Sequence, residues 1–203
     1  MPTIVVVHYT AMQTAQAAIE RLCDPVAEVS AHYLICRSGA LTQMVPEDQR
    51  AWHAGAGEWR GETDINSRSI GIELDNDGTH PFSEPQMAAL ETLLRGILRR
   101  WTIAPDNVIG HSDMAPGRKI DPGPRFDWAR LAHQTLAAPA GRGKGPQNPT
   151  SAGFRALART AGYTADVDDK TLLDTVRLRF RPAASGPLHP DDFASLGLIV
   201  PPT

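Results

Sequence analysis

Two short hydrophobic runs lack the alternation of apolar and polar positions that marks a half-exposed strand. One run covers Ile4–His8, with the sequence IVVVH, and the other covers Ser69–Leu74, with the sequence SIGIEL. Unbroken runs of this length, rich in β-branched residues, are typical of strands that are buried on both faces. We therefore expect two central strands of a sheet, with His8 and Glu73 at or near their C-terminal ends.

Three further short runs complete the predicted sheet. His32–Cys36 and Leu41–Val45 flank the sequence Arg-Ser-Gly-Ala, which predicts an antiparallel hairpin with Gly39 in the turn. Residues 108–109 predict a brief additional strand. Residues 55–67 contain glycines and charges without periodicity, which indicates a long loop that either carries function or is disordered.

Helical periodicity appears in three places within the same part of the chain. Residues 14–22 place Ala and Leu on one side, and residues 83–101 follow a strongly amphipathic pattern after an N-cap serine, Ser83. Asp127 caps a third helix, which we expect to continue through Leu136. Because helices alternate with strands but a hairpin interrupts them, the predicted fold class is α/β, with a central mixed β-sheet flanked by helices.

A composition change divides the chain. Residues 138–151, APAGRGKGPQNPTS, are rich in Pro and Gly and have no apolar period, so we expect a linker between a domain at 1–137 and a small helical domain at 152–203. A unit this small is marginal in stability by itself. Three short helices are expected within it: Gly153–Ala161, Asp168–Phe180 and Asp191–Leu196.

Charge and hydropathy exclude several classes of partner. The 203 residues contain 20 basic and 23 acidic side chains and no block of five like charges, which argues against nucleic acid as a partner. The apolar runs are far too short to span a bilayer. The N-terminus shows no visible signal peptide, so the expected location is the cytoplasm, with periplasm or cell envelope as the alternative if a signal has been removed. The oligomeric state is left open.

The two cysteines do not indicate a metal or disulfide framework. Cys23 and Cys36 lie outside any CxxC pattern, so a Cys-rich zinc site is excluded. We expect both to be buried free thiols.

Residues 110–123, GHSDMAPGRKIDPG, collect reactive side chains where prolines and glycines oppose regular structure. We expect no helix or strand within this segment. Asp113 and Arg118 are expected to pair and hold the loop together. A connecting loop has little need for so many charged groups, so the segment is a candidate functional loop.

Three residues offer a candidate metal site. His111 and Asp121 are too far apart in sequence to share adjacent turns of one helix, so only a folded loop brings them together, and His8 at the mouth of a central strand can complete the set. Two imidazoles and one carboxylate leave the fourth position of tetrahedral zinc open, as in catalytic sites. Alternatively, His8 is a strand-end histidine with satisfied hydrogen bonds, and Asp121 forms a turn before Pro122.

Other residues are candidates for acid–base or substrate roles. Glu73 stands where a buried strand surfaces, and a half-buried carboxylate needs a partner or a task. Lys119 can stabilise a developing oxyanion, although a lone lysine is usually solvated. Trp52 and His53 can line a groove; equally, Trp52 packs into the hydrophobic layer with His53 as its polar neighbour.

Taken together, five sequence blocks resemble the zinc-dependent N-acetylmuramoyl-L-alanine amidases of the bacterial AmpD and AmiD type. This fold family also includes phage T7 lysozyme and the peptidoglycan recognition proteins. The blocks occur in the family's order and cover most of residues 3–136. They are VVVHYT, VSAHYLI, AWHAG, INSRSIGIELDN and GHSDMAPGRKIDPG.

The resemblance implies one zinc ion held by His8, His111 and Asp121, with Glu73 and Lys119 as the catalytic pair. It implies hydrolysis of the amide between the lactyl group of N-acetylmuramic acid and L-alanine, so that peptidoglycan or muropeptides are the expected substrates. Glu73 would be the general base and Lys119 the oxyanion stabiliser.

The same resemblance marks substrate-side residues and a possible accessory domain. Asn66, Trp52 and His53 match blocks that flank the groove in relatives, so they are expected on the substrate side. Some relatives have a tyrosine where this chain has Ala31, and Tyr33 receives no catalytic role. Residues 162–182 resemble a small peptidoglycan-binding domain, with TVRLRFRP where family members often have an AFQ-like segment before RFRP. A role in packing only is the alternative for these helices.

Two alternative functions remain open at this stage. A binding-only protein of the same fold would recognise peptidoglycan without cleaving it, and a zinc peptidase would cut inside the stem peptide with the same metal ligands. Retention of all three candidate ligands together with Glu73 and Lys119 argues against the first. Whether the substrate is intact wall or anhydro-muropeptide is open, as is the preferred third residue of the stem.

Overall fold

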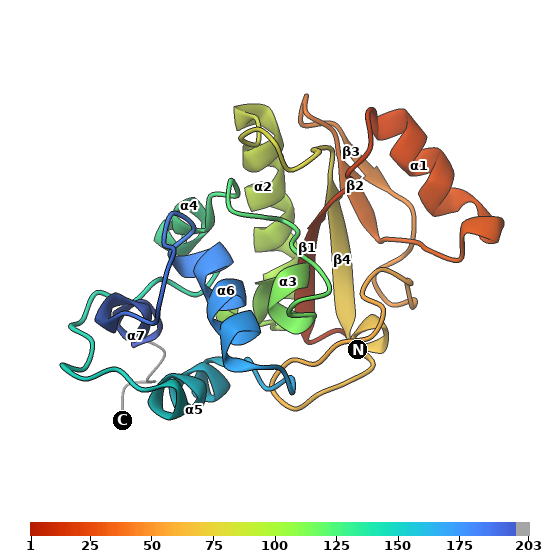
Figure 1. Cartoon of the computed structure of the whole chain (residues 1–203). Coiled ribbons are helices and arrows are strands. Elements are labelled where there is room, and N and C mark those ends of the chain that lie inside the picture. Colours follow the sequence, from red (N-terminus) through yellow and green to blue (C-terminus); the bar gives the residue numbers. More distant parts are fainter. Residues whose placement is uncertain (198–203) are drawn as a thin grey trace.

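The computed structural model describes residues 1–197 of the chain, and a five-stranded mixed sheet forms its centre (Figure 1). The strands lie in the order β3-β2-β4-β1-β5. All neighbouring pairs are parallel except β2 and β3, which form an antiparallel hairpin. This confirms the predicted fold class. The strands are β1 (Ile4–Tyr9), β2 (Tyr33–Ile35), β3 (Leu41–Gln43), β4 (Ser69–Leu74) and β5 (Val108–Gly110).

The alternation of side chains along β1 and β4 gives the sheet two different faces. Val5 and Val7 belong to one hydrophobic cluster and Ile4 and Val6 to another, on the opposite side of β1. His8 follows Val6 on that second side. In the parallel register, Ser69, Gly71 and Glu73 of β4 stand beside Ile4, Val6 and His8 respectively. The second face of the sheet therefore carries the polar residues of the two central strands.

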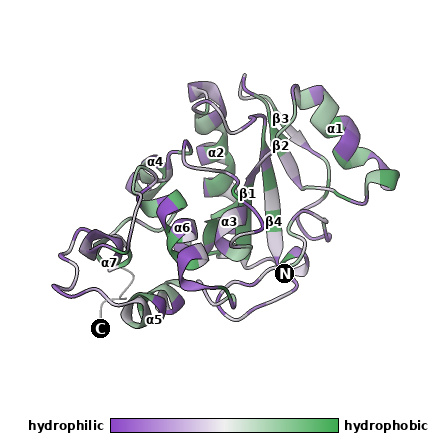
Figure 2. Ribbon diagram, in the orientation of Figure 1, coloured by the Kyte–Doolittle hydropathy of each residue, from purple (hydrophilic) through white to green (hydrophobic). Residues whose placement is uncertain are grey.

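One long helix covers the first face. α2 (Glu84–Trp101) begins at Ser83, whose hydroxyl accepts a hydrogen bond from the amide of Gln86, and its buried apolar residues join Val5, Val7 and the isoleucines of β4. Figure 2 shows that α2 carries both strongly hydrophobic and strongly hydrophilic residues, as an amphipathic helix does.

The second face is covered partly by the C-terminal part of the chain. Residues of α5 and α6 share a hydrophobic cluster with Ile4, Val6 and Ile109 of the sheet. Figure 1 shows α5, α6 and α7 gathered on the side of the molecule where α3 lies. Residues 138–150, between α4 and α5, contain no helix or strand. The helices in this part of the chain are α3 (His111–Met114), α4 (Trp128–His133), α5 (Ser151–Ala161), α6 (Asp169–Phe180) and α7 (Pro190–Leu196). Among them, α4 packs on the first face, where Trp128 and Leu131 join the cluster of Val5 and Val7.

The N-terminal helix lies apart from these elements. α1 (Ala15–Cys23) starts at Thr14, which accepts a hydrogen bond from the amide of Ala17, and it lies on the β2 and β3 side of the sheet (Figure 1). Three 3₁₀ helices complete the description: η1 (Pro25–Ala27), η2 (Ile65–Ser67) and η3 (Pro105–Asn107). No helix within residues 1–197 is long and apolar enough to cross a membrane.

Several sequence expectations about local structure are wrong. Residues 110–123 contain a helical turn, α3, because the Asp113 carboxylate accepts a hydrogen bond from the amide of Gly110 and so caps the turn ahead of Pro116. α4 has its expected cap at Asp127 but ends at His133 rather than Leu136, since Thr135 adopts a left-handed conformation with φ of 58°.

The hairpin strands are shorter than expected and the thiols are not buried. β2 and β3 pair over three residues each, with Gly39 at φ of 86° in the predicted turn. Cys23 is exposed because it is the last residue of α1, and Cys36 is half-buried; both are free. The predicted C-terminal domain extends to residue 203, and its last six residues lie outside the described part of the chain.

Candidate active site

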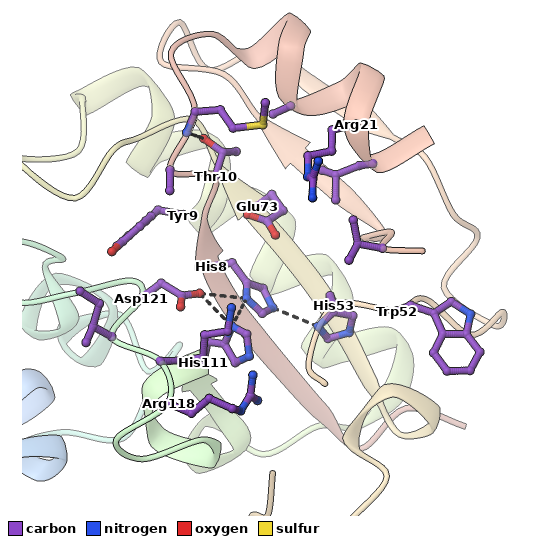
Figure 3. Close-up of a pocket in the computed structure, with 17 residues that line it drawn as sticks. His8, Tyr9, Thr10, Arg21, Trp52, His53, Glu73, His111, Arg118 and Asp121 are labelled. Carbon is purple, nitrogen blue, oxygen red and sulfur yellow. Dashed lines mark hydrogen bonds and ion pairs between the residues drawn. The ribbon is translucent and has the colours of Figure 1, made fainter. Parts of the chain in front are cut away.

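Three side chains from separate parts of the chain converge beside the second face of the sheet (Figure 3). His8 Nδ1 lies 3.0 Å from His111 Nδ1 and 3.0 Å from Asp121 Oδ2, and His111 Nδ1 lies 3.1 Å from the same carboxylate oxygen. These residues form a buried cluster that can hold a metal ion. The predicted ligand residues are therefore together in space.

Secondary structure positions each member of this cluster. His8 is the fifth residue of β1, and His111 opens α3 directly after β5, which pairs with β1. Asp121 returns to the cluster through the loop after α3. The amide of Ser112 donates a 3.0 Å hydrogen bond to the Asp121 carbonyl oxygen, which ties the two ends of this loop together.

Burial and mutual contact shift the ionisation of the cluster. Burial would raise the pKa of Asp121, but the His111 and His8 imidazoles in contact with its carboxylate outweigh this effect and hold the pKa well below its usual value. Burial, followed by the nearby His111, lowers the pKa of His8 to about 4 against the opposing effect of Asp121. A neutral imidazole beside an ionised carboxylate is the protonation state that metal binding requires.

Glu73 stands beside His8 on the neighbouring strand and faces the same space (Figure 3). Its Oε2 atom is buried and has no hydrogen-bond partner among residues 1–197. Burial and the charge of Asp121 raise the pKa of Glu73 to about 8, against the opposing effect of Lys119. A carboxyl group with a raised pKa and a free oxygen in a cleft has the properties of an acid–base catalyst.

A groove opens in front of the cluster. Its cavity of about 520 Å³ is lined by His8, His111, Asp121 and Glu73 and also by Lys119 and Trp52. A second cavity of about 630 Å³ borders it and shares Leu22, Val29 and Trp52 with it. The His8–His111–Asp121 cluster lines only the first cavity, whereas residues of α1 line both.

The residues expected on the substrate side occupy different environments. Trp52 is 55% exposed and lines the groove, so its alternative placement in the hydrophobic layer is wrong. The His53 ring also borders the groove but contacts His8, at 3.0 Å between His53 Nδ1 and His8 Nε2. Asn66 is buried, lies outside the residues that line the groove, and uses its side-chain oxygen to accept hydrogen bonds from two backbone amides.

Sequence reasoning missed several groove residues. Tyr9, Thr10 and Arg21 line the cavity, and only their closeness in sequence to His8 or their position on α1 marks them in advance. Arg118 donates a 2.8 Å hydrogen bond to the Ala54 carbonyl and another to Ala56, so the expected Arg118–Asp113 pair is wrong. These backbone contacts depend on tertiary structure and leave no sequence signal.

Asp113 instead contacts the C-terminal helices. Its carboxylate accepts hydrogen bonds from Arg179 at 2.8 Å and from the Tyr163 hydroxyl at 2.7 Å, and both side chains of the Arg179–Asp113 pair are almost fully buried. The Arg179 guanidinium also lies over the Trp128 ring. The C-terminal helices therefore support the turn that carries His111.

Tyr33 lies away from the cluster. Its hydroxyl donates a 2.8 Å hydrogen bond to Glu47, and its side chain belongs to the hydrophobic cluster under α2, on the first face of the sheet. This position agrees with the absence of a catalytic assignment for Tyr33.

A buried His-His-Asp cluster in a groove, with a carboxyl group of raised pKa beside it, is typical of a metal-dependent hydrolase. The chain belongs to the N-acetylmuramoyl-L-alanine amidase family, whose sequence profile matches residues 1–124. It is therefore a hydrolase of the amide bond that joins the lactyl group of N-acetylmuramic acid to L-alanine.

Relatives support this assignment over different lengths of the chain. The sequence is 36% identical to N-acetylmuramoyl-L-alanine amidase AmiD of Escherichia coli over 88% of this chain and 75% of that protein. It is 38% identical to 1,6-anhydro-N-acetylmuramyl-L-alanine amidase AmpD of Enterobacter cloacae, over 64% of this chain and 79% of that one.

Solved structures extend the likeness to the C-terminal helices. A complex of Escherichia coli AmiD with anhydro-N-acetylmuramic acid-L-Ala-D-gamma-Glu-L-Lys matches 97% of this chain and 87% of that one with a TM-score of 0.87 and 32% identity. AmpDH3 of Pseudomonas aeruginosa matches 97% of this chain and 90% of that one, with a TM-score of 0.86 and 30% identity.

Proposed function

We propose that His8, His111 and Asp121 hold one zinc ion and that the enzyme cleaves muropeptides, including those that carry anhydro-N-acetylmuramic acid. The observation that carries the proposal is the triangle of three ligand atoms, 3.0–3.1 Å apart, in the groove. The relatives named as anhydro-muramyl amidases, and the AmiD complex with such a peptide, support the choice of substrate.

The donor set fits zinc by a simple geometric test. Tetrahedral zinc lies about 2.0–2.1 Å from each nitrogen or oxygen ligand, which separates two ligands by about 3.3 Å. The observed separations of 3.0–3.1 Å are close to this value, so the three atoms could hold one ion together. Two unprotonated imidazole nitrogens that face each other beside a carboxylate oxygen favour a cation at the point between them. The buried Glu73 oxygen has no partner among residues 1–197, so it is free to accept a hydrogen bond from a water or substrate atom in the groove.

The roles of the remaining residues follow from their positions. Bound zinc would polarise the scissile carbonyl and lower the pKa of a water molecule. Glu73 takes a proton from the attacking water and passes it to the leaving nitrogen of L-alanine. Lys119 places a positive charge in the groove that stabilises the oxyanion. One water is consumed, and the products are a lactyl carboxylate and a free amine.

Mass spectrometry of an anhydro-muropeptide digest tests the activity. We expect metal-loaded enzyme to release the intact stem peptide with a free L-alanine amine, and chelated enzyme to release nothing. Release of amino acids from within the stem would indicate a zinc peptidase instead. If enzyme whose zinc content has been measured cleaves no muropeptide, the protein is a binding-only protein and the proposal is rejected.

Two substitutions separate metal binding from catalysis. His8→Ala is expected to lose zinc because it removes one of three ligands. Glu73→Gln is expected to keep zinc and to lower kcat by about 10²–10⁴-fold, because it removes only proton transfer. Elemental analysis measures the zinc content of both variants, and initial rates measure their kcat. Full activity of Glu73→Gln would show that another group is the base.

We also propose a division of labour along the chain. Residues 1–137 carry the catalytic groups, and residues 138–151 connect them to the small helical domain at 152–203. The described part of that domain supports the turn that begins with His111, through Arg179 and Tyr163. Glycan binding by this region stays a prediction, as does the cytoplasmic location. Sedimentation with purified wall and cell fractionation test them.

A further inference from the structure

Both imidazoles of the metal cluster make their outward hydrogen bonds to one dipeptide, His53-Ala54. His8 Nε2 lies 3.0 Å from His53 Nδ1, and His111 Nε2 lies 2.9 Å from the Ala54 carbonyl oxygen. His8 and His111 are 103 residues apart in sequence, yet two adjacent residues orient both rings. Partners of this kind on the far nitrogen set the tautomer and the ring plane of a ligating histidine.

A chain of hydrogen bonds determines the tautomer of His53. The Ile65 carbonyl oxygen can only accept, so the Ser69 hydroxyl donates to it, at 2.6 Å. Because that hydroxyl has a single proton, Ser69 Oγ must accept from His53 Nε2, 3.2 Å away. Neutral His53 then carries its proton on Nε2 and presents an unprotonated Nδ1.

The direction of this chain determines the tautomer of His8. An unprotonated His53 Nδ1 accepts, so His8 donates from Nε2 and leaves its own Nδ1 without a proton. His111 reaches the same state independently, because the Ala54 carbonyl accepts from its Nε2. Both Nδ1 lone pairs therefore point toward Asp121, at the point where the ion would sit.

The surroundings hold His53 in this position. The Asn66 side-chain oxygen accepts hydrogen bonds from the backbone amides of His53, at 3.0 Å, and Ala54, at 2.8 Å. The His53 ring lies against Gly71 of β4, where an added Cβ would come within 2.4–2.7 Å of ring atoms. Only glycine at position 71 leaves space for the imidazole, so the backbone of β4 accommodates the His53 ring in this position.

We propose that His53 is a positioning residue, oriented by Ser69 and Asn66, that holds His8 in the tautomer whose Nδ1 binds the metal. The inference rests on the proposed zinc site and replaces the expected substrate roles of His53 and Asn66. In this arrangement His53 acts on the reaction through His8 and does not need to touch the substrate.

A matched pair of substitutions at position 53 tests the proposal. His53→Leu removes the acceptor, whereas His53→Asn keeps an oxygen close to the position of Nδ1. We expect His53→Leu to weaken zinc binding about 10–100-fold, as outer partners of metal ligands do, and His53→Asn to stay within a few-fold of the wild type. Competition with a chromophoric chelator measures the zinc dissociation constant.

A second readout distinguishes positioning from packing. The ¹⁵N chemical shifts of the His8 ring in metal-free protein report its tautomer, and we expect an Nε2 proton in the wild type and in His53→Asn but a mixture in His53→Leu. If His53→Leu fails to fold, Ser69→Ala provides the same test from the far end of the hydrogen-bond chain. This substitution removes the group that fixes the His53 tautomer, and Ser69 contacts neither the metal ligands nor the groove, so a mixture of His8 tautomers and weaker zinc binding are expected.

Two outcomes would overturn the inference, and a third would overturn the proposed function on which it rests. Unchanged zinc affinity with a raised KM in His53→Leu would make His53 a substrate contact. Unchanged zinc affinity and an unchanged His8 tautomer in both His53→Leu and Ser69→Ala would also reject the positioning role. Failure of the wild type itself to bind zinc or to cleave muropeptide would instead reject the proposed function.

Discussion

The environment of Glu73 shows how strand placement prepares a carboxyl group for acid–base chemistry. The strand β4 is hydrophobic up to the point where it reaches the groove, so the first acidic residue is half-buried and stands beside His8. Desolvation there favours the protonated form, and Asp121 acts in the same direction. Removing water and adding a neighbouring negative charge therefore convert an ordinary glutamate into a group that exchanges protons near neutral pH.

The stability of the metal-free protein is expected to depend on the Glu73 proton. Its folded pKa of about 8 exceeds the ordinary value of 4.5, so the folded state holds the proton more tightly and stability falls as pH rises between these values. His8 acts in the other direction, because its lowered pKa costs stability only as pH falls below 6.5. Above pH 6.5, of these two groups only Glu73 contributes.

Urea denaturation of chelated wild type and Glu73→Gln at several pH values from 6.5 to 8 checks this. The wild type should lose up to about 1.4 kcal/mol of unfolding free energy per pH unit relative to the glutamine variant. Parallel pH curves for the two proteins would mean that Glu73 is already ionised at pH 6.5.

Individual site residues differ in how far sequence could reveal them. His8 and Glu73 are predictable because unbroken apolar runs end at or beside them, and His111 with Asp121 because a loop full of reactive groups stands out. The Ser69–His53 contact joins β4 to a residue outside any helix or strand, and no local pattern encodes that approach. Hydrogen bonds across long sequence separations are decided by the assembled fold.

At the scale of elements, α3 and α6 are joined by a buried ion pair. Arg179 of α6 donates to Asp113 of α3 at 2.8 Å and to the Val108 carbonyl of β5 at 3.1 Å. Burial and the charge of Asp113 also raise the pKa of Tyr163 well above its usual value, so its hydroxyl remains a donor to that carboxylate. The one-turn helix that begins with His111 is thus fixed by groups outside its own sequence.

Removing one partner of this pair is expected to be costly. Arg179→Met should lower the free energy of unfolding by about 3–5 kcal/mol, because it leaves the Asp113 charge buried. The double variant Arg179→Met with Asp113→Asn should lose less than the sum of the two single variants, since the double variant leaves no charge of this pair behind. Urea denaturation of the three proteins measures this, and additive losses would show that the two residues do not interact.

Elements with a strong period were predictable and short ones were not. The amphipathic pattern and Ser83 cap of α2 fix that helix almost to the residue, and the glycine at position 39 fixes the hairpin turn. α3 was missed because its cap, Asp113, lies inside the turn and its support comes from α6. A four-residue helix is stabilised by its surroundings, so its own sequence cannot predict it.

At the scale of the whole molecule, the catalytic part and the C-terminal helices share one hydrophobic core. Ile109 of β5 and Met114 of α3 belong to the same buried cluster as Phe154 of α5 and Leu172 of α6. The glycine-rich connection between α4 and α5 separates the two parts in sequence but not in packing. Cooperative unfolding of both parts is the physical consequence.

Calorimetry of the full chain is therefore expected to show a single transition with equal calorimetric and van't Hoff enthalpies. Ending the chain after Ala137 should lower Tm by on the order of 10 °C. Several kcal/mol of packing free energy are lost, and each kcal/mol changes Tm by about 2–4 °C for a protein of this size. Two separate transitions in the full chain, or an unchanged Tm after truncation, would show that the parts fold independently.

The exposure of Trp52 also has a spectroscopic consequence. The chain contains four tryptophans, and Trp59 and Trp128 are buried and Trp101 half-buried, whereas Trp52 is 55% exposed at the junction of the two cavities. Collisional quenchers dissolved in water are expected to reach its indole first, and a muropeptide bound in the groove is expected to shield it. Trp52 would then report substrate docking by its own fluorescence, and no added label would be required.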